Sequence, residues 1–366
     1  MSVKSLHQHE PMVRFYQQAT VGALVSLLCL PTSGFGQNKP TPDTASAEQF
    51  RIAASYPSST PVLGKAQQRL LDLINNAGGG SILATLIPPG EVVPVEKVLN
   101  AVANGSLEAA FTDPATWVDK DPAFALFSGM PLSPDVLHGI AWVERGEGSR
   151  LMKELYARYN VEAQLCGAFM VPAGLWLRKP IEKTADLIDL KVSADGLGAA
   201  VMAGVGARVS QLPRASLASA LKDGSIDAVR VESLSLAEQY AFVGDQAPYY
   251  YPQGWGQQTG IRVLIVSRQF WASMSDAHRT IVRSACNSLT VEELARSQAA
   301  RSEAVSFLKE KQVNSYRFSP ETTAAIEKSW RGVTEKLSES NEWFATGWQS
   351  WSRFSAGSRA FESLIR

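Results

Sequence analysis

The chain has 366 residues, with 35 Lys or Arg balanced by 35 Asp or Glu, so its formal charge at neutral pH is zero. This balance argues against nucleic acid or an acidic membrane surface as a partner, because both require an excess of basic residues. A hydrophobic content of 45% with 19% charged residues is typical of a globular protein and excludes a disordered one. Three cysteines are too few for a disulfide-built scaffold, and the length suits two domains of roughly 150 residues.

Residues 1–36 have the pattern of an export signal peptide. Lys4 and Arg14 precede an apolar run over 21–30, and small residues ending in Gly36 form an acceptable cleavage site. An apolar helix of this length spans about 15 Å, which is half of a bilayer core and too short to cross it. We therefore expect export to the periplasm with cleavage near Gly36, the alternative being an uncleaved N-terminal anchor.

Two cysteines remain after this signal, Cys166 in an apolar strand-like run and Cys286 on a predicted helix. An oxidising compartment permits a disulfide between them. We expect two unpaired, half-buried thiols instead, because free cysteines behave as small apolar residues.

The mature chain begins with a polar, proline-containing linker over 37–48. Strands and helices then alternate. We predict strands over 50–55, 81–87 and 107–112, and helices over 62–76 and 94–104. This alternation indicates parallel α/β layers.

A second block of the same kind follows. We predict strands over 163–171, 174–177, 191–194, 208–211, 226–231 and 261–266, and helices over 197–204 and 216–223. Two separate α/β blocks predict two lobes. Lobe I is expected to comprise 49–168 with 258–318, and lobe II to comprise 169–257.

The rest of the chain is predicted to be helical. Ser275 can cap a helix that runs without Gly or Pro to about residue 312, which is unusually long. Ser319 and Pro320 start the C-terminal helices over 319–366. One helix face carries an aromatic stripe, Phe344, Trp348, Trp351 and Phe354. The stripe suits packing against the chain's own lobes as well as a subunit interface.

Catalytic constellations are missing from the mature sequence. Its two histidines, His138 and His278, have no partner at helical spacing, and there is no G-x-S-x-G elbow or C-x-x-C pair. The turn at Gly196 and Gly198 could cradle an anion, but Val201 replaces the third glycine of a dinucleotide fingerprint. A binding protein is favoured, because a site between two lobes needs only a few convergent polar groups.

Several segments resemble the solute receptors of tripartite ATP-independent periplasmic (TRAP) transporters, in the branch that binds 2-oxo acids and related carboxylates. They are KDPAFA at 120–125, WLRKPI at 176–181, DLIDLK at 186–191, QLP at 211–213, IDA at 226–228 and YYYPQGW at 249–255. With the glycines at 79–80, PPGE at 88–91 and the aromatic C-terminus, the resemblance covers nearly all of 49–366. It implies a two-lobed α/β periplasmic binding protein fold, type II-like, with a long helix spanning the lobes and C-terminal helices. It also implies delivery of a small organic acid to the TRAP membrane subunits, and dimers through the C-terminal helices.

The binding positions differ from this branch. The arginine that grips the ligand carboxylate falls on Ser193, and a glutamine that contacts the ligand falls on Pro172. A glutamate and a tryptophan of this branch fall on Arg230 and Val231, and a second glutamate falls on Gln257 or Gln258. In the branch, the two glutamates help to hold a metal ion beside the ligand.

These substitutions lead to two expectations. Hard cations need anionic oxygens, so we expect the metal site to be lost and no cofactor to be bound. A guanidinium can bind a carboxylate through two parallel hydrogen bonds, so we expect Arg230 to be the anion anchor. The alternative is that Arg230 points outward or pairs with Glu232, and that the ligand is neutral.

Other candidates for the cleft lie at or just past the ends of predicted strands, where α/β folds build their sites. With Arg230, Ser193 and Gln257, they complete the expected ligand site: Tyr56, Thr112, Asp113, Phe169, Trp176, Tyr251 and Trp255. For each aromatic residue, packing in a lobe core is the alternative.

The sequence thus predicts a periplasmic receptor that closes two lobes on a small organic acid. A receptor for a sensor kinase or for another transporter class remains an alternative. An exported enzyme is disfavoured, because the chain has few histidines and no paired carboxylates in evident register.

Overall fold

A computed structural model describes residues 47–60, 63–129, 135–170, 174–231, 244–256 and 259–364. These residues belong to one compact unit, Ser46–Arg366. The expected signal peptide over 1–36 and all but the end of the linker lie outside the described residues.

One sheet has five strands in the order β2-β1-β3-β10-β4. Its strands are β1 (Glu48–Ala54), β2 (Ile82–Ile87), β3 (Ala109–Thr112), β4 (Val161–Met170) and β10 (Thr259–Ser267). Every residue of β10 is buried, and its side chains alternate between two cores. Ile261, Val263 and Ile265 join one core, whereas Leu264 and Val266 join the other. Both faces of this sheet are therefore covered.

A second sheet has six short strands in the order β11-β9-β5-β8-β6-β7. The strands are β5 (Leu175–Leu177), β6 (Lys191–Ser193), β7 (Arg208–Ser210), β8 (Ala228–Arg230), β9 (Tyr249–Tyr251) and β11 (Asn314–Ser315). Its faces carry two further cores, which contain Trp330 and Trp176 respectively.

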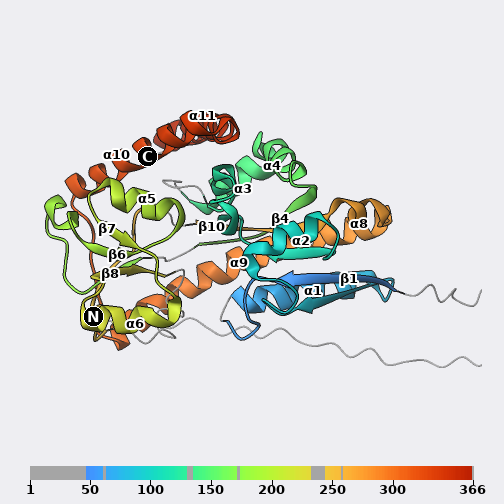
Figure 1. The fold of residues 1–366 in the computed structure, drawn as a ribbon, viewed down its shortest axis with the longest axis horizontal. Coiled ribbons are helices and arrows are strands. Elements are labelled where there is room, and N and C mark those ends of the chain that lie inside the picture. The colour runs from blue at the N-terminus through green and yellow to red at the C-terminus, as the bar shows by residue number, and fades with distance from the viewer. Residues whose placement is uncertain are drawn as a thin grey trace, which may run out of the picture. The chain divides into compact units, whose positions relative to one another are not determined.

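Helices cover both sheets (Figure 1). The α-helices are α1 (Leu63–Gly78), α2 (Val98–Ala103), α3 (Val136–Arg145), α4 (Gly148–Ala157), α5 (Gly196–Gly204), α6 (Leu217–Asp223), α8 (Arg268–Ser273), α9 (Asp276–Glu310), α10 (Pro320–Ser340) and α11 (Glu342–Leu364). Short 3₁₀ turns are η1 (Val95–Lys97), η2 (Pro114–Trp117), η3 (Pro122–Phe127), η4 (Thr184–Leu187) and η5 (Arg214–Ser216).

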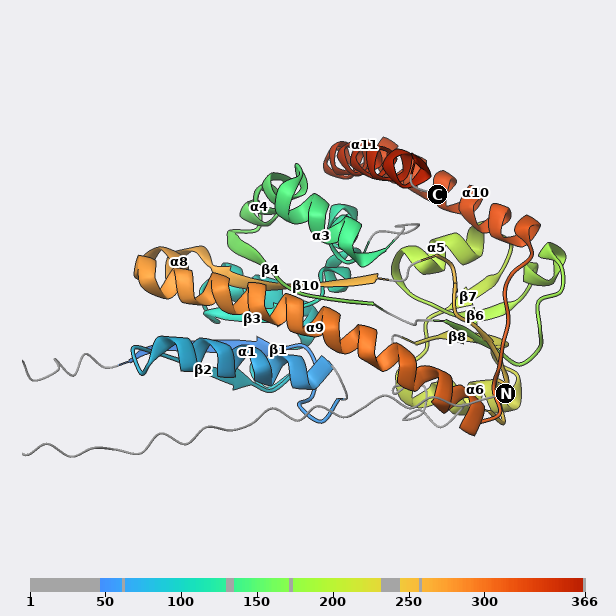
Figure 2. The same ribbon diagram turned by 180° about the vertical axis from the view of Figure 1, so that it is seen from behind.

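The long helix α9 connects the two sheets. Its 35 residues begin where the Ser275 hydroxyl accepts a hydrogen bond from the backbone N–H of His278 at 3.1 Å, as an N-cap does. Figure 2 shows α9 running beside α1 and the five-stranded sheet and on toward the six-stranded sheet. The expected long helix that spans both α/β blocks is confirmed.

The structure also corrects the expected strand pairing. The predicted parallel layers hold for β1 with β2 and β3, and for β6 with β7 and β8. However, β10 is antiparallel to β3 and β4, and β5 is antiparallel to β8 and β9. The alternation of strands and helices predicts which residues join a sheet, but it does not determine whether each strand is parallel or antiparallel to its neighbours.

Cys166 on β4 and Cys286 on α9 form a disulfide, so the expectation of two free thiols is wrong. Their Cα atoms lie 4.1 Å apart, and both residues are buried. The local sequence revealed the apolar surroundings of each cysteine correctly. It contained no information that α9 packs on β4 and brings together residues 120 positions apart.

The aromatic stripe of α11 packs within the chain. Phe344 and Trp351 are buried in one core of the five-stranded sheet, and Trp348 and Phe354 pack against that core. The ring centroids of Trp351 and Trp142 are 5.7 Å apart in an edge-to-face arrangement.

Among the described residues, none of the helices combines the length and the apolar character that a membrane span requires.

Candidate functional site

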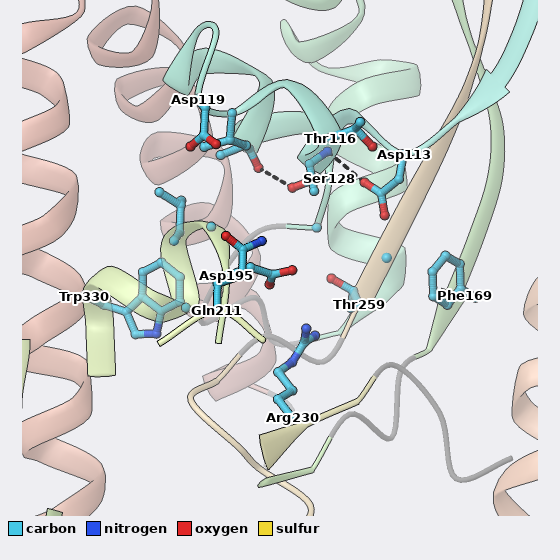
Figure 3. Close-up of a pocket in the computed structure, with 18 of the residues that line it drawn as sticks. Asp113, Thr116, Asp119, Ser128, Phe169, Asp195, Gln211, Arg230, Thr259 and Trp330 are labelled. Atoms are coloured by element: carbon cyan, nitrogen blue, oxygen red, sulfur yellow. Dashed lines mark hydrogen bonds between the residues drawn. The ribbon is translucent and has the colours of Figure 1, made fainter. Parts of the chain in front are cut away.

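A cavity of about 310 Å³ is lined by residues from both sheets (Figure 3). The five-stranded sheet contributes residues at or near the ends of β3, β4 and β10, and the six-stranded sheet contributes residues that end or follow β6, β7 and β8. The polar lining residues are Tyr56, Asp113, Thr116, Asp119, Ser128, Asp195, Gln211, Arg230 and Thr259.

The structure brings four of the predicted site residues together in this cavity, namely Tyr56, Asp113, Phe169 and Arg230. Arg230 is the last residue of β8 and is half-buried. Figure 3 shows its guanidinium pointing into the cavity, toward Asp195 and Thr259. The predicted residue Gln257, like Pro172, lies outside the described residues.

Other predicted site residues do not line the cavity. Trp176 and Tyr251 are fully buried in the two cores of the six-stranded sheet. The Tyr251 hydroxyl accepts a hydrogen bond from the backbone N–H of Ile181 at 2.8 Å. Ser193 is buried at the end of β6, and Thr112 is buried at the end of β3.

Trp255 contacts Arg230 instead of lining the cavity. It is only 2% exposed, and the Arg230 guanidinium carbon lies 5.2 Å from the centroid of its ring. Cation–π contact of this kind orients a guanidinium without neutralising its charge. The indole rests against Gly198, and its backbone carbonyl accepts a hydrogen bond from the Trp330 side chain. Trp255 therefore positions Arg230.

The close approach at Gly198 predicts the effect of one added methyl group. A Cβ at this position would lie 2.4 Å from the Trp255 ring, so Gly198→Ala must displace the indole and with it the guanidinium. We expect a loss of about 1–3 kcal/mol in the free energy of unfolding, measured by urea denaturation. The matched control is Gly332→Ala on α10, where an added Cβ meets no atom within 4 Å. That variant should be more stable by about 0.5–1 kcal/mol. Equal effects at the two positions would contradict the tight packing.

Three aspartates line the cavity. Asp113 was predicted as a site residue, whereas the other two were not. Asp113, Asp119 and Asp195 all line it, and Asp113 accepts a hydrogen bond from the backbone N–H of Ala115 at 2.8 Å. Burial raises the pKa of Tyr156, and the nearby Asp113 carboxylate raises it further. The cavity thus contains more carboxylates than guanidinium groups among its described residues.

Asp119, Asp195, Gln211, Thr259 and Trp330 were not predicted as site residues. Asp195 directly follows the predicted strand over 191–194, and Gln211 ends the predicted strand over 208–211. These positions at strand ends are the signal that could have identified both residues. Trp330 comes from α10, and no local pattern places that helix at the cavity.

The comparisons with known proteins agree on one family. Residues 52–341 match the model of the bacterial extracellular solute-binding proteins, family 7 (DctP). The monocarboxylate 2-oxoacid-binding periplasmic protein of Nostoc sp. PCC 7120 is 27% identical over 315 residues, which are 84% of each chain.

Two crystal structures share the fold. A TRAP transporter solute binding protein from Bordetella bronchiseptica RB50 has a TM-score of 0.80 at 26% identity, over 87% of this chain and 94% of the other. It is a mixed-occupancy dimer with copurified calcium and picolinate in one active site. A TRAP periplasmic solute binding protein from Colwellia psychrerythraea, with bound calcium and pyruvate, has a TM-score of 0.81 at 22% identity, over 87% and 97%. The expected two-lobed α/β fold is confirmed.

These relatives contradict the expectation that no metal takes part. Both crystal structures contain calcium beside the small acid. The expectation followed from Arg230 at a carboxylate position, and it overlooked the hard anionic oxygens that Asp113, Asp119 and Asp195 bring to the cavity. Within the described ranges, however, no three His, Cys, Asp or Glu side chains converge to form a preformed metal site.

Proposed function

Because this chain belongs to family 7 of the bacterial extracellular solute-binding proteins, we propose that it is a periplasmic receptor for a small 2-oxo acid or a related monocarboxylate. It would deliver this ligand to the membrane subunits of a TRAP transporter. The observation that carries the proposal is the Arg230 guanidinium, which points into a cavity shared by the two sheets. The Nostoc relative, whose name describes a monocarboxylate 2-oxoacid-binding protein, supports the ligand class.

The residues of the cavity suit such an acid. Arg230 can bind the carboxylate through two hydrogen bonds, and this pairing is strong where water is excluded. The side chains of Gln211 and Thr259 can donate hydrogen bonds to the 2-oxo oxygen. The buried ring of Phe169 offers an apolar wall for the remainder of the ligand.

Binding by both lobes would couple the ligand to closure. Arg230 and Gln211 come from the six-stranded sheet, whereas Phe169 and Thr259 come from the five-stranded sheet. A ligand favours the closed state only through contacts that it makes with both sides. We propose that the acid is held and released without chemical change, since neither His138 nor His278 lines the cavity.

Thermal unfolding with a ligand panel tests this function. We expect pyruvate, longer 2-oxo acids or picolinate to raise the melting temperature, with an added stability of about 2.7 kcal/mol at 100 times the dissociation constant. Matched neutral amides such as pyruvamide serve as controls, and each compound is tested with calcium and with EDTA. Equal stabilisation by the amides would favour a neutral ligand, and stabilisation by no acid would refute the proposal. Proton NMR of the best ligand over hours would detect any turnover.

We further propose that the mature chain begins near residue 37 and that its C-terminal helices permit a homodimer. The aromatic stripe packs against the chain's own core, so another face of α11 would have to make the contact. Phe361 and Leu364 on α11 are exposed and supply apolar surface. Mass spectrometry of the secreted protein and light scattering after gel filtration test these two points.

A further inference from the structure

A fully buried ion pair lies behind the ligand cavity without lining it. Nη1 of Arg262 on β10 donates a hydrogen bond to Oε1 of Glu293 on α9 at 2.7 Å. The two side chains are 1% and 2% exposed. Nη2 of Arg262 and Oε2 of Glu293 are also buried and have no hydrogen-bond partner among the described residues.

A buried ion pair of this kind contributes little to stability. Removing two charges from water costs free energy that their attraction only partly returns, and apolar residues of similar volume often serve at least as well. Burial raises the pKa of Glu293, and contact with Arg262 opposes this shift. The pair therefore calls for an explanation other than stability.

The Arg262 guanidinium contacts an aromatic ring of the cavity wall. Its carbon lies 4.5 Å from the ring centroid of Phe169, and it lies 5.7 Å from that of Phe111. Phe169 lines the cavity, whereas Phe111 and Arg262 do not. Desolvated cation–π contacts are among the stronger ones, because the charge has no water to interact with instead.

Gly260 packs against the same Phe169 ring. Gly260 stands opposite Phe169 in the β4–β10 ladder, and a Cβ at Gly260 would lie 2.2 Å from the ring. Gly260 and Arg262 are two residues apart on β10, and both contact the Phe169 ring. The ring is thus held between a bare backbone and a guanidinium.

Glu293 connects this arrangement to α9. A Cβ at Gly167 on β4 would lie 2.3 Å from Oε2 of Glu293, so the carboxylate packs directly on the strand that carries Phe169. One turn later, the Ser297 hydroxyl accepts a hydrogen bond from the backbone N–H of Met170 at 3.2 Å. The helix that runs between the two sheets therefore supports the cavity wall from behind.

We propose that the Arg262–Glu293 pair positions the Phe169 ring, and that the ring so placed determines which substituent fits beside the carboxylate of the ligand. The second half of this inference rests on the proposed receptor function. Arg262 and Glu293 act through Phe169 and do not touch the ligand themselves.

The first test needs no ligand. The double variant Arg262→Met/Glu293→Leu removes both charges with similar side-chain volumes, and selective ¹³C labelling of phenylalanine rings reports on Phe169, with assignment from Phe169→Leu. We expect the Phe169 ring resonance to move and its ring flips to accelerate. The matched control is Arg69→Met/Glu292→Leu, which removes a half-buried ion pair, with an N–O distance of 2.7 Å, that links α1 to the same helix α9. It should leave the Phe169 resonance unchanged. An unchanged resonance in the Arg262→Met/Glu293→Leu variant overturns the proposal.

The second test measures binding of pyruvate and of 4-methyl-2-oxopentanoate by calorimetry in the presence of calcium. We expect pyruvate to bind about tenfold more weakly to the double variant, and the preference between the two acids to change. Phe169→Leu should weaken pyruvate binding in the wild-type background and add nothing further in the double variant, because the two changes act on one ring. Full additivity overturns the proposal.

Arg262→Lys provides a second variant if the double variant does not fold. It retains the charge and can retain the ion pair, but an ammonium lacks the flat face that stacks on a ring. The Phe169 resonance is expected to move in this variant too, and its constancy would also overturn the proposal. If the resonance moves but no acid binds the wild-type protein, the receptor function fails while the positioning of Phe169 stands.

Discussion

The Arg230→Met variant should bind pyruvate at least about 30-fold more weakly than the wild-type protein, because truncating one partner of a desolvated charge pair costs about 2–5 kcal/mol. Arg230 is half-buried at the end of β8, and its guanidinium points into the cavity. Methionine retains most of the side-chain volume against Trp255, so the folded protein should unfold at nearly the same temperature. Isothermal titration calorimetry with pyruvate, in calcium, measures the effect.

Two further variants separate charge from geometry at this site. Arg230→Lys retains the charge but loses the bidentate fork, so its affinity should fall between those of the wild-type protein and Arg230→Met. Arg208→Met removes an exposed arginine of β7 that pairs with Asp189 at 2.8 Å, and it should leave binding unchanged. Wild-type affinity in Arg230→Met would show that another group holds the carboxylate.

Removing the disulfide should cause the largest loss of stability. The bond closes a loop between residues 120 apart, for which the chain-entropy relation gives about 4–5 kcal/mol at 25 °C. We expect the Cys166→Ala/Cys286→Ala variant to lose roughly this amount, measured as a lower urea midpoint. The loss arises chiefly because the unfolded chain regains conformational freedom.

Reducing agent provides an independent control for this prediction. Dithiothreitol should lower the urea midpoint of the wild-type protein and leave that of the double alanine variant unchanged. A wild-type midpoint that does not respond to complete reduction, verified by thiol titration, would contradict the prediction.

Much of the secondary structure was predictable because its signals are local. Ser275 caps α9, Ser319 with Pro320 starts α10, and the strands of both sheets follow runs of apolar residues. The strands β9 and β11 were not predicted. The strand β11 is only two residues long, which leaves no period to detect, and β9 is a short run of tyrosines between Pro248 and Pro252, which are typical of a loop.

The candidate site was predictable in part. Residues at strand ends were found where the strand was clear, as for Asp113 and Arg230. Trp176 and Tyr251 were predicted by the same rule, but their strands, β5 and β9, lie in the interior of the six-stranded sheet, where side chains face a core on either side. Asp119 and Asp195 were not predicted. The family resemblance identifies only the positions where related proteins bind their ligand, and it does not identify carboxylates at other positions that line the same cavity.

The sequence by itself determined the α/β class, the order of the main elements, the long helix and the resemblance to a family of receptors. Each of these depends on spacing within a few residues, or on short segments whose order is preserved. Only the tertiary structure decided that Cys166 meets Cys286, that Trp255 lies against Arg230, and that Arg262 pairs with Glu293 behind Phe169. These contacts join residues that are 120, 25 and 31 positions apart, and they depend on how helices and strands pack, which no local pattern encodes. The balance of 35 acidic and 35 basic residues excluded whole classes of partner, but the distribution of four of those charges around one cavity is a property of the fold alone.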